Sequence, residues 1–161
     1  MRGTVSGALV ESIDLIPTFL EALGGEVADH RLEGRSLPPL LRGRSGLSPW
    51  RDYAVSELDY GFRQAHRELM LGPSEARAYM VATDRWKYVF YERFRPQHFD
   101  LLNDPQEFVD LGADSGYQLV VREMADRLFD WTRHRKTRVT INDADVERLS
   151  SFAGKRLIGL W

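Results

Sequence analysis

The chain has 161 residues, of which 43% are hydrophobic and 11% aromatic, and a formal net charge of −2. That is enough sequence for one domain with a core, and the near-neutral charge gives no general attraction to nucleic acid or to a membrane surface. The absence of cysteine excludes a disulfide framework, a thiolate metal site and a cysteine nucleophile. With no apolar run long enough to span a bilayer and no signal-like N-terminal region, we expect a cytoplasmic protein.

The first 50 residues predict a strand, a helix and a loop. Residues 4–12 are expected to form the strand, and residues 13–25 the helix. Asp14 is a suitable N-cap, and Gly24 with the glycine after it is a typical helix end. The expected apolar face of the helix consists of Ile16, Phe19, Leu20 and Leu23. Proline and glycine then predict a loop, with one helical turn near residues 39–42.

A strand is expected at residues 53–58, followed by an irregular polar segment at 59–74. Residues 79–83 and 86–91 alternate between two faces, which is typical of half-buried antiparallel strands joined by a turn. A third, short strand follows near residues 98–102. Asp104, Pro105 and Glu107 then have the spacing of a helix N-terminus.

Two helices are predicted in the remaining sequence. The longest covers residues 116–136, with apolar side chains recurring every three or four positions and basic residues in its last turn. A shorter helix is expected near residues 143–151, capped by Asn142 or Asp143. The tail at residues 155–161 ends in Leu-Ile-Gly-Leu-Trp, which should pack on something.

Asp29-His30 is the most suggestive candidate metal pair, because both side chains can ligate a divalent cation. The simpler interpretation is a pair of loop residues. His66, together with Arg63, Arg67 and Glu68, could bind an anionic substrate, although a solvated loop explains the same residues.

His98 lies on a short expected strand with no neighbouring base, and is therefore interpreted as a half-buried sheet residue. The basic run at residues 133–138 could contact phosphates, but its position at a helix end favours capping. None of the serines weighed as nucleophiles has the required sequence context; they are Ser12, Ser36, Ser45, Ser48, Ser56 and Ser74. We therefore assign no catalytic, cofactor-binding or metal-binding residue.

Several motifs, in order, resemble the C-terminal subdomain of the sulfatase family in the alkaline phosphatase superfamily. They are Ile13-Asp14-Leu15-Ile16-Pro17-Thr18, Gly34-Arg35-Ser36-Leu37 with Leu40-Leu41, Arg85-Trp86-Lys87-Tyr88, Phe99-Asp100-Leu101, Asp104-Pro105, Glu107 and Asp110-Leu111. A closer resemblance to phosphonate monoester hydrolases rests on residues 56–63 and 94–97, the 137–140 linker and the 158–161 end.

The resemblance implies hydrolysis of sulfate, phosphonate or phosphate esters by a formylglycine nucleophile aided by a divalent metal. In the family, C-x-P-x-R or S-x-P-x-R provides the nucleophile and Asp-His-Gly provides metal ligands; neither motif occurs here, since Arg31 follows His30. We therefore expect the C-terminal portion of such a hydrolase, inactive alone, with no cofactor in this chain and a divalent metal in the full-length enzyme.

The expected fold is α/β, or α+β for the isolated piece. Residues 1–50 would form the last strand–helix unit of a sulfatase-like large domain and a connecting loop. Residues 51–136 would form a small antiparallel sheet of about four strands packed by a long helix, and residues 137–161 a C-terminal extension.

The expected partner is the missing N-terminal catalytic portion, or a separate polypeptide that supplies it. A homo-oligomer assembled through the C-terminal tail is also expected, and neither nucleic acid nor membrane is. One alternative is a non-catalytic module for complementation or oligomerisation. Another is a stand-alone anion-binding domain that uses Arg63, His66 and Arg67.

Overall fold

The computed structural model describes residues 3, 5–43 and 50–150. Its helices are α1 (Leu15–Ala22), α2 (Pro38–Leu41), α3 (Ala65–Glu68), α4 (Gln118–His134) and α5 (Asp143–Ser150). Its strands are β1 (Ala54–Asp59), β2 (Arg77–Ala82), β3 (Trp86–Tyr91) and β4 (Gln97–Asp100). Short 3-10 turns lie at Ser12–Asp14, Pro73–Glu75 and Ser115–Tyr117. The chain divides into two compact units, Met1–Ser12 with Pro39–His134, and Ile13–Pro38 with Arg135–Trp161.

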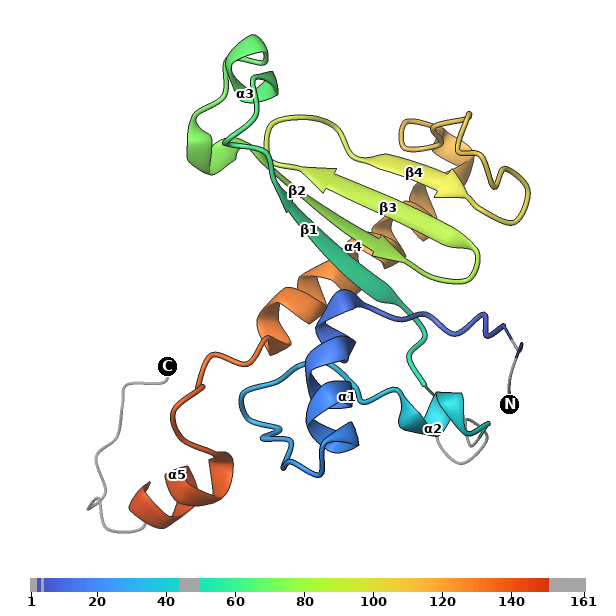
Figure 1. Cartoon of the computed structure of the whole chain (residues 1–161). Coiled ribbons are helices and arrows are strands. Elements are labelled where there is room, and N and C mark those ends of the chain that lie inside the picture. The colour runs from blue at the N-terminus through green and yellow to red at the C-terminus, as the bar shows by residue number, and fades with distance from the viewer. Residues whose placement is uncertain (1–2, 4, 44–49, 151–161) are drawn as a thin grey trace. The chain divides into compact units, whose positions relative to one another are not determined.

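The first unit is built on a four-stranded antiparallel meander in the order β1-β2-β3-β4 (Figure 1). The register places Val81 of β2 opposite Tyr88 of β3, and Tyr88 opposite His98 of β4. One face of this sheet packs against α4. The core between sheet and helix consists of Val81, Tyr88, Val121, Met124 and Leu128. The alternating aromatic face and the helical periodicity expected from the sequence are thus confirmed, as is the α/β class with a small antiparallel sheet.

The predicted strand at residues 4–12 is wrong, since residues 5–11 have no regular structure and Thr4 lies outside the described residues. Val5 is 98% exposed, so this segment has no apolar sheet face to bury. The segment is held by side chains instead. Glu11 accepts the main-chain N–H of Val55 at 2.6 Å and pairs with Arg51 at 3.0 Å. The Glu11 carboxylate therefore takes up a main-chain N–H group of β1.

In the second unit, α1 forms where the sequence predicts it, but Asp14 does not cap it. Asp14 is itself in helical geometry, and its buried carboxylate accepts the N–H of Arg35 at 2.7 Å. Gly24 ends the helix with a φ of 75°, as expected for a left-handed C-terminal residue. The last helix, α5, also forms, and Asn142 accepts the N–H of Asp145 at 2.8 Å. The apolar tail lies outside the described residues.

The predicted helix start at Asp104 is wrong, because residues 101–110 form turns. Asp104 uses its side chain to accept the N–H of Val109 at 2.8 Å, and Glu107 adopts a left-handed φ of 59°. This conformation is incompatible with a helix and closes the segment on itself. The Asp-Pro sequence therefore makes a compact loop beside β4.

Candidate functional site

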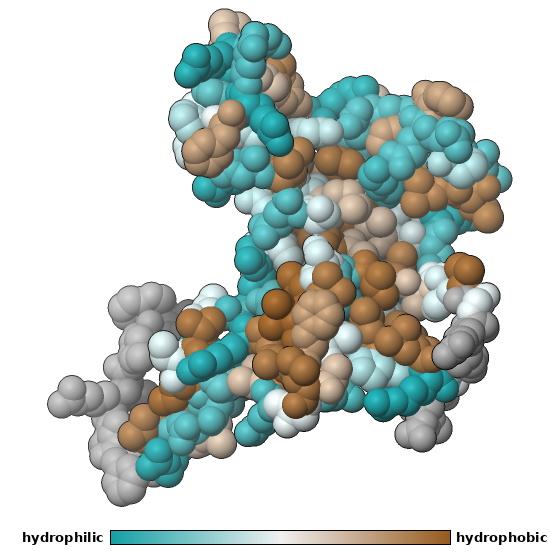
Figure 2. All heavy atoms as spheres, viewed as in Figure 1, coloured by the Kyte–Doolittle hydropathy of each residue, from teal (hydrophilic) through white to brown (hydrophobic). Residues whose placement is uncertain are grey.

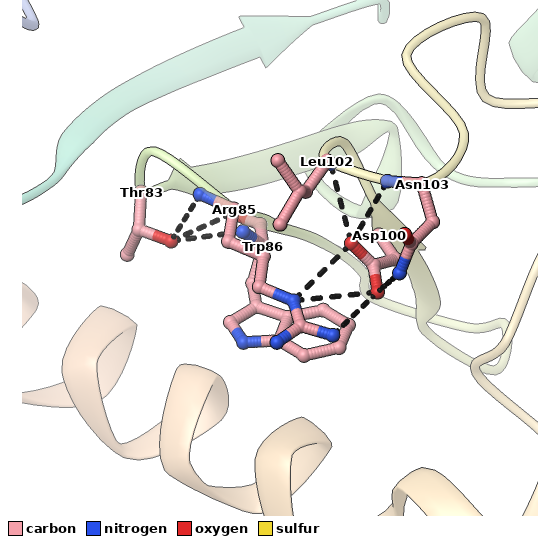
Figure 3. Close-up of polar contacts among 6 residues, drawn as sticks. All are labelled: Thr83, Arg85, Trp86, Asp100, Leu102 and Asn103. Atoms are coloured by element: carbon pink, nitrogen blue, oxygen red, sulfur yellow. Dashed lines mark hydrogen bonds and ion pairs between the residues drawn. The ribbon is translucent and has the colours of Figure 1, made fainter.

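Two of the motifs that carry the family resemblance, Arg85-Trp86-Lys87-Tyr88 and Phe99-Asp100-Leu101, meet at the turn between β2 and β3 and the end of β4. Arg85, in the turn, donates from Nη2 to Oδ2 of Asp100 at 2.9 Å and from Nε to both carboxylate oxygens at 3.3 Å. Thr83 fixes the turn, since its Oγ1 accepts the N–H groups of Arg85 at 3.3 Å and Trp86 at 2.9 Å (Figure 3). The short turn thus presents the guanidinium directly to the carboxylate.

Asp100 is the centre of this cluster. Its Oδ1 accepts the N–H groups of Leu102 at 3.2 Å and Asn103 at 3.3 Å, and its Oδ2 accepts Nδ2 of Asn103 at 2.8 Å (Figure 3). The hydrogen bond from Arg85 lowers the pKa of Asp100 to about 2, helped by Asn103 and opposed by burial. A carboxylate with this pKa and these partners is a fixed acceptor. It is not suited to act as a general acid or base near neutral pH.

Trp86 and His98 form the aromatic part of the cluster. The guanidinium of Arg85 lies 4.3 Å from the centroid of the Trp86 ring, and the His98 ring stacks on Trp86 at 5.1 Å. His98 is fully buried, and neither ring nitrogen makes a hydrogen bond of good geometry with a described residue. Burial lowers the pKa of His98, and the carboxylates of Asp100 and Asp110 offset this only in part. His98 is therefore a fully buried residue of β4, where the sequence predicted a half-buried sheet residue.

Two further ion pairs hold the loop that follows β4. Lys87 on β3 pairs with Glu107 at 2.6 Å. Asp110 accepts the N–H of His98 at 3.1 Å and the N–H of Gly112 at 2.9 Å, and pairs with Arg95 at 2.8 Å. Burial alone would raise the pKa of Asp110, but these donors outweigh it and the pKa lies below its usual value. The motif residues Lys87 and Asp110 thus fasten the loop to the sheet.

None of the other candidates raised by the sequence belongs to this cluster. Asp29 and His30 lie in a turn of the second unit, where the Asp29 carbonyl accepts Nζ of Lys136. The described residues contain no group of three or more His, Asp or Glu placed to hold a metal ion. A divalent metal therefore has no fitting donor set in the described part of the chain.

The anion-binding candidates fall on α3 and its approach. Arg63, His66, Arg67 and Glu68 line an open pocket of about 680 Å³. The Nδ1 atom of His66 lies 2.7 Å from the Arg63 carbonyl oxygen, and Gln64 donates to Glu68 at 2.8 Å.

In the basic run, Arg133 pairs with Asp130, and Nδ1 of His134 lies 2.7 Å from the carbonyl oxygen of the same aspartate, at the end of α4. Within the second unit, Lys136 donates its main-chain N–H to Glu33 at 2.7 Å, and Arg138 pairs with Asp143 at 2.9 Å. Of these contacts, only the one made by His134 is with a carbonyl of the last turn of α4, so the capping interpretation fits that residue.

The structure places three of the serines considered as nucleophiles outside the Arg85–Asp100 cluster. Ser36 donates to Glu21, Ser12 begins a 3-10 turn and Ser56 is exposed on β1. Ser45 and Ser48 lie outside the described residues.

A pocket that sequence reasoning missed lies at the other end of the sheet. It has a volume of about 400 Å³ and is lined by Tyr60, Leu69, Tyr91, Phe94, Arg95 and Gln97. The alternation of residues 86–91 predicted that Tyr91 lies on the face of the sheet opposite Trp86, and Tyr91 forms part of the pocket wall. The other walls come from separate segments.

The first unit is a four-stranded meander packed by one long helix, and its motif side chains form ion pairs that fasten a loop. These features, with the family match, define a C-terminal subdomain of the sulfatase type in the alkaline phosphatase superfamily. The chain belongs to the N-sulphoglucosamine sulphohydrolase C-terminal family, which matches residues 1–134.

Among curated relatives, it is 33% identical over 132 residues to the multifunctional alkaline phosphatase superfamily protein PehA of Trinickia caryophylli, covering 80% of this chain and 25% of that protein. It is 28% identical over 158 residues to the N-acetylglucosamine-6-O-sulfatase of Bacteroides thetaiotaomicron, covering 96% of this chain and 26% of that protein. The chain thus spans about a quarter of the length of these relatives.

Two solved structures support the same assignment. The phosphonate monoester hydrolase SpPMH of Silicibacter pomeroyi superposes with a TM-score of 0.76 at 27% identity, over 87% of this chain and 28% of that chain. The phosphonate monoester hydrolase of Agrobacterium radiobacter gives a TM-score of 0.64 at 32% identity, over 73% of this chain and 23% of that chain. No helix among the described residues has the length and apolar character needed to cross a membrane.

Proposed function

We propose that this chain is the C-terminal portion of a hydrolase of phosphonate, phosphate or sulfate esters, and that it has no hydrolase activity alone. Another portion or polypeptide would supply the nucleophile and the divalent metal, in the cytoplasm. The proposal is supported by the family membership, the short coverage of the relatives and the structural use made of the motif carboxylates.

The observation that carries the proposal is the exposed apolar face of α1. Ile16 is 53% exposed, Phe19 56% and Leu23 86%. Hydrophobic side chains dominate the visible surface of this helix (Figure 2). A contiguous apolar face of this kind is typical of an interaction surface. Fully burying one such side chain is worth roughly 1.5–3 kcal/mol, so three of them supply a strong driving force for docking.

The same helix is oriented by the Gly34-Arg35-Ser36-Leu37 loop. Thr18 of α1 accepts the N–H of Leu37 at 2.9 Å, Ser36 donates to Glu21, and Asp14 holds the N–H of Arg35. These polar contacts fix one side of α1 within its own unit. The apolar side is left to receive the missing catalytic portion.

The test is to purify the tagged chain from its native cell and to identify by mass spectrometry what accompanies it. We expect peptides that carry a C-x-P-x-R or S-x-P-x-R nucleophile motif and an Asp-His-Gly motif, together with metal-dependent turnover of an aryl phosphonate or sulfate ester. The chain purified alone should show no turnover. Metal-dependent hydrolysis by the chain alone would overturn the proposal.

A pair of variants tests whether docking occurs through the apolar face of α1. Phe19→Asp should abolish co-purification and turnover, because a carboxylate replaces a ring at the centre of the apolar face. Leu119→Asp is the matched control, since Leu119 is 82% exposed on α4, outside the proposed face. Equal loss with both variants would contradict the assignment of the interface to α1.

The second candidate is a non-catalytic complementation or oligomerisation module. The same exposed face of α1 favours it, because two copies could bury it against each other. In that case the chain would purify as a folded homo-oligomer with no catalytic polypeptide, and Phe19→Asp would reduce its mass in light scattering. A role for the apolar tail in such an assembly stays a prediction.

A further inference from the structure

The pocket of about 400 Å³ lies between the β1–β2 connection and the β3–β4 hairpin. In the antiparallel meander, β1 and β3 run in the same direction and finish at the same end of the sheet, which is where both connections lie (Figure 1). Its volume is within the range of small-molecule sites. Like such sites, the pocket has a mostly apolar wall and a few polar groups.

The apolar wall is aromatic. Tyr60 and Tyr91 contribute two phenol rings, and Phe94 contributes a ring that remains 45% exposed. Leu69, also 45% exposed, provides an aliphatic surface on the α3 side. Aromatic rings favour offset-stacked or edge-to-face contact with another ring. The wall therefore suits a flat, unsaturated ring better than an extended chain.

The polar groups are hydrogen-bond donors. Tyr91 donates to Oε1 of Gln97 at 2.8 Å, which leaves the Gln97 amide nitrogen without a partner among the described residues. Arg95 uses Nη1 for Asp110 and the Pro96 carbonyl, while its Nη2 and Nε have no partner among them. The carboxylate of Asp110 is shared with two main-chain N–H groups, so it offsets the charge of Arg95 only in part. None of the described residues that line the pocket has an acidic side chain.

We propose that this pocket binds an aromatic ring that carries an oxyanion, such as an aryl phosphonate or aryl sulfate. The ring would contact Tyr91 and Phe94, and the oxyanion would accept hydrogen bonds from Arg95 and Gln97. The site is a binding site that involves no bond-making step. It rests on the proposed function only for the choice of phosphonate as the probe.

The experiment is a titration of the full chain with phenylphosphonate, followed by NMR or calorimetry. We expect saturable one-to-one binding. Methylphosphonate, which lacks the ring, and benzyl alcohol, which lacks the anion, should each bind at least about tenfold more weakly, because each loses one of the two contacts.

Variants assign the contacts. Phe94→Ala and Arg95→Gln should each weaken phenylphosphonate binding about tenfold, and Arg95→Lys should retain part of the affinity because it keeps the charge. Arg93→Gln is the matched control, since Arg93 is 61% exposed, pairs with Glu75 and does not line the pocket. If Phe94→Ala fails to fold, Phe94→Leu keeps most of the apolar volume and removes the ring.

Equal binding of methylphosphonate and phenylphosphonate would overturn the inference, as would equal weakening by Arg93→Gln and Arg95→Gln. So would a folded chain that binds no phenylphosphonate. These outcomes are separate from the proposed function, which is tested by co-purification and turnover. Turnover by the co-purified complex, with no phenylphosphonate binding to the chain, would overturn only the pocket. Phenylphosphonate binding to the chain, with no catalytic polypeptide in the co-purification, would overturn only the proposed function.

Discussion

Nζ of Lys87 lies 2.6 Å from Oε2 of Glu107, and this ion pair holds the loop after β4 against the face of β3 that points away from α4. Glu107 reaches Lys87 from a backbone with a φ of 59°, a left-handed conformation that costs roughly 1–2 kcal/mol for a residue other than glycine. The contact and the strain therefore oppose each other at one residue.

This opposition gives a testable asymmetry. Lys87→Met should lower the free energy of unfolding of the first unit by up to about 1 kcal/mol, as expected for a partly exposed ion pair. Glu107→Gly loses the same pair but relieves the backbone strain, so its loss should be smaller. Urea unfolding of both variants and the double variant measures the difference. A larger loss for Glu107→Gly than for Lys87→Met would contradict this account.

Asp100→Asn should be more costly, because it removes a charged acceptor with several donors. We expect a loss of roughly 1.5–3 kcal/mol in the free energy of unfolding at neutral pH, the range for hydrogen bonds to charged groups. Asp84→Asn is the control, since Asp84 is exposed in the neighbouring turn and should change stability little. Similar losses for the two variants would show that Asp100 is not the centre of the cluster.

The pH dependence of this effect has a defined sign. The folded-state pKa of Asp100 is lowered from 3.8 to about 2, so the unfolded chain binds its proton more tightly than the folded chain does. The stability that Asp100 contributes is therefore present above pH 3.8 and is lost as the pH falls from there toward 2. The stability difference between the original chain and Asp100→Asn should shrink over that window. A difference independent of pH would exclude the ion pair as its source.

His98 should give a separate window at higher pH. Burial lowers its folded-state pKa below 6.5, so the unfolded chain takes up a proton first as the pH falls. Stability is fully present above pH 6.5 and decreases below it, until the folded chain also protonates. His98→Leu, with a similar volume, should remove this slope. It should also cost little at pH 7, because it eliminates two buried nitrogens without good hydrogen bonds. A slope that persists in the variant would contradict this assignment.

The sheet and α4 could be predicted because their signals are local and repeat. Tyr88 alternates with Lys87 and Val89 along β3, while Val121, Met124 and Leu128 recur at helical spacing. Each pattern marks the face that must be buried, so the two faces could be expected to pack together. The structure confirms that packing.

The two wrong secondary-structure predictions, at residues 4–12 and at Asp104, fall where a carboxylate side chain accepts a main-chain N–H group. Asp104 followed by a proline has the same local signature in a helix N-cap and in a closed turn, and the pairing of Glu107 with Lys87, 20 positions earlier, favours the turn. Glu11 likewise meets the edge of β1 with its carboxylate, where a strand was expected. The pocket was missed for a related reason, because Tyr60, Leu69 and Phe94 come together only in the fold.

Gly34 provides the last prediction, for the second unit. A Cβ atom at this position would overlap the main-chain carbonyl of Ile13, because the loop crosses the start of α1 at close range. Gly34→Ala must therefore push the loop away from the helix and weaken the contacts made by Asp14 and Thr18. We expect a loss of about 1–3 kcal/mol, the range for forced overpacking, seen as a lower thermal midpoint. Gly7→Ala is the control, since a Cβ there meets nothing within 4 Å. Because the loop orients the apolar face of α1, Gly34→Ala should also reduce co-purification of the catalytic partner. An unchanged yield would show that the loop contacts do not orient the docking surface.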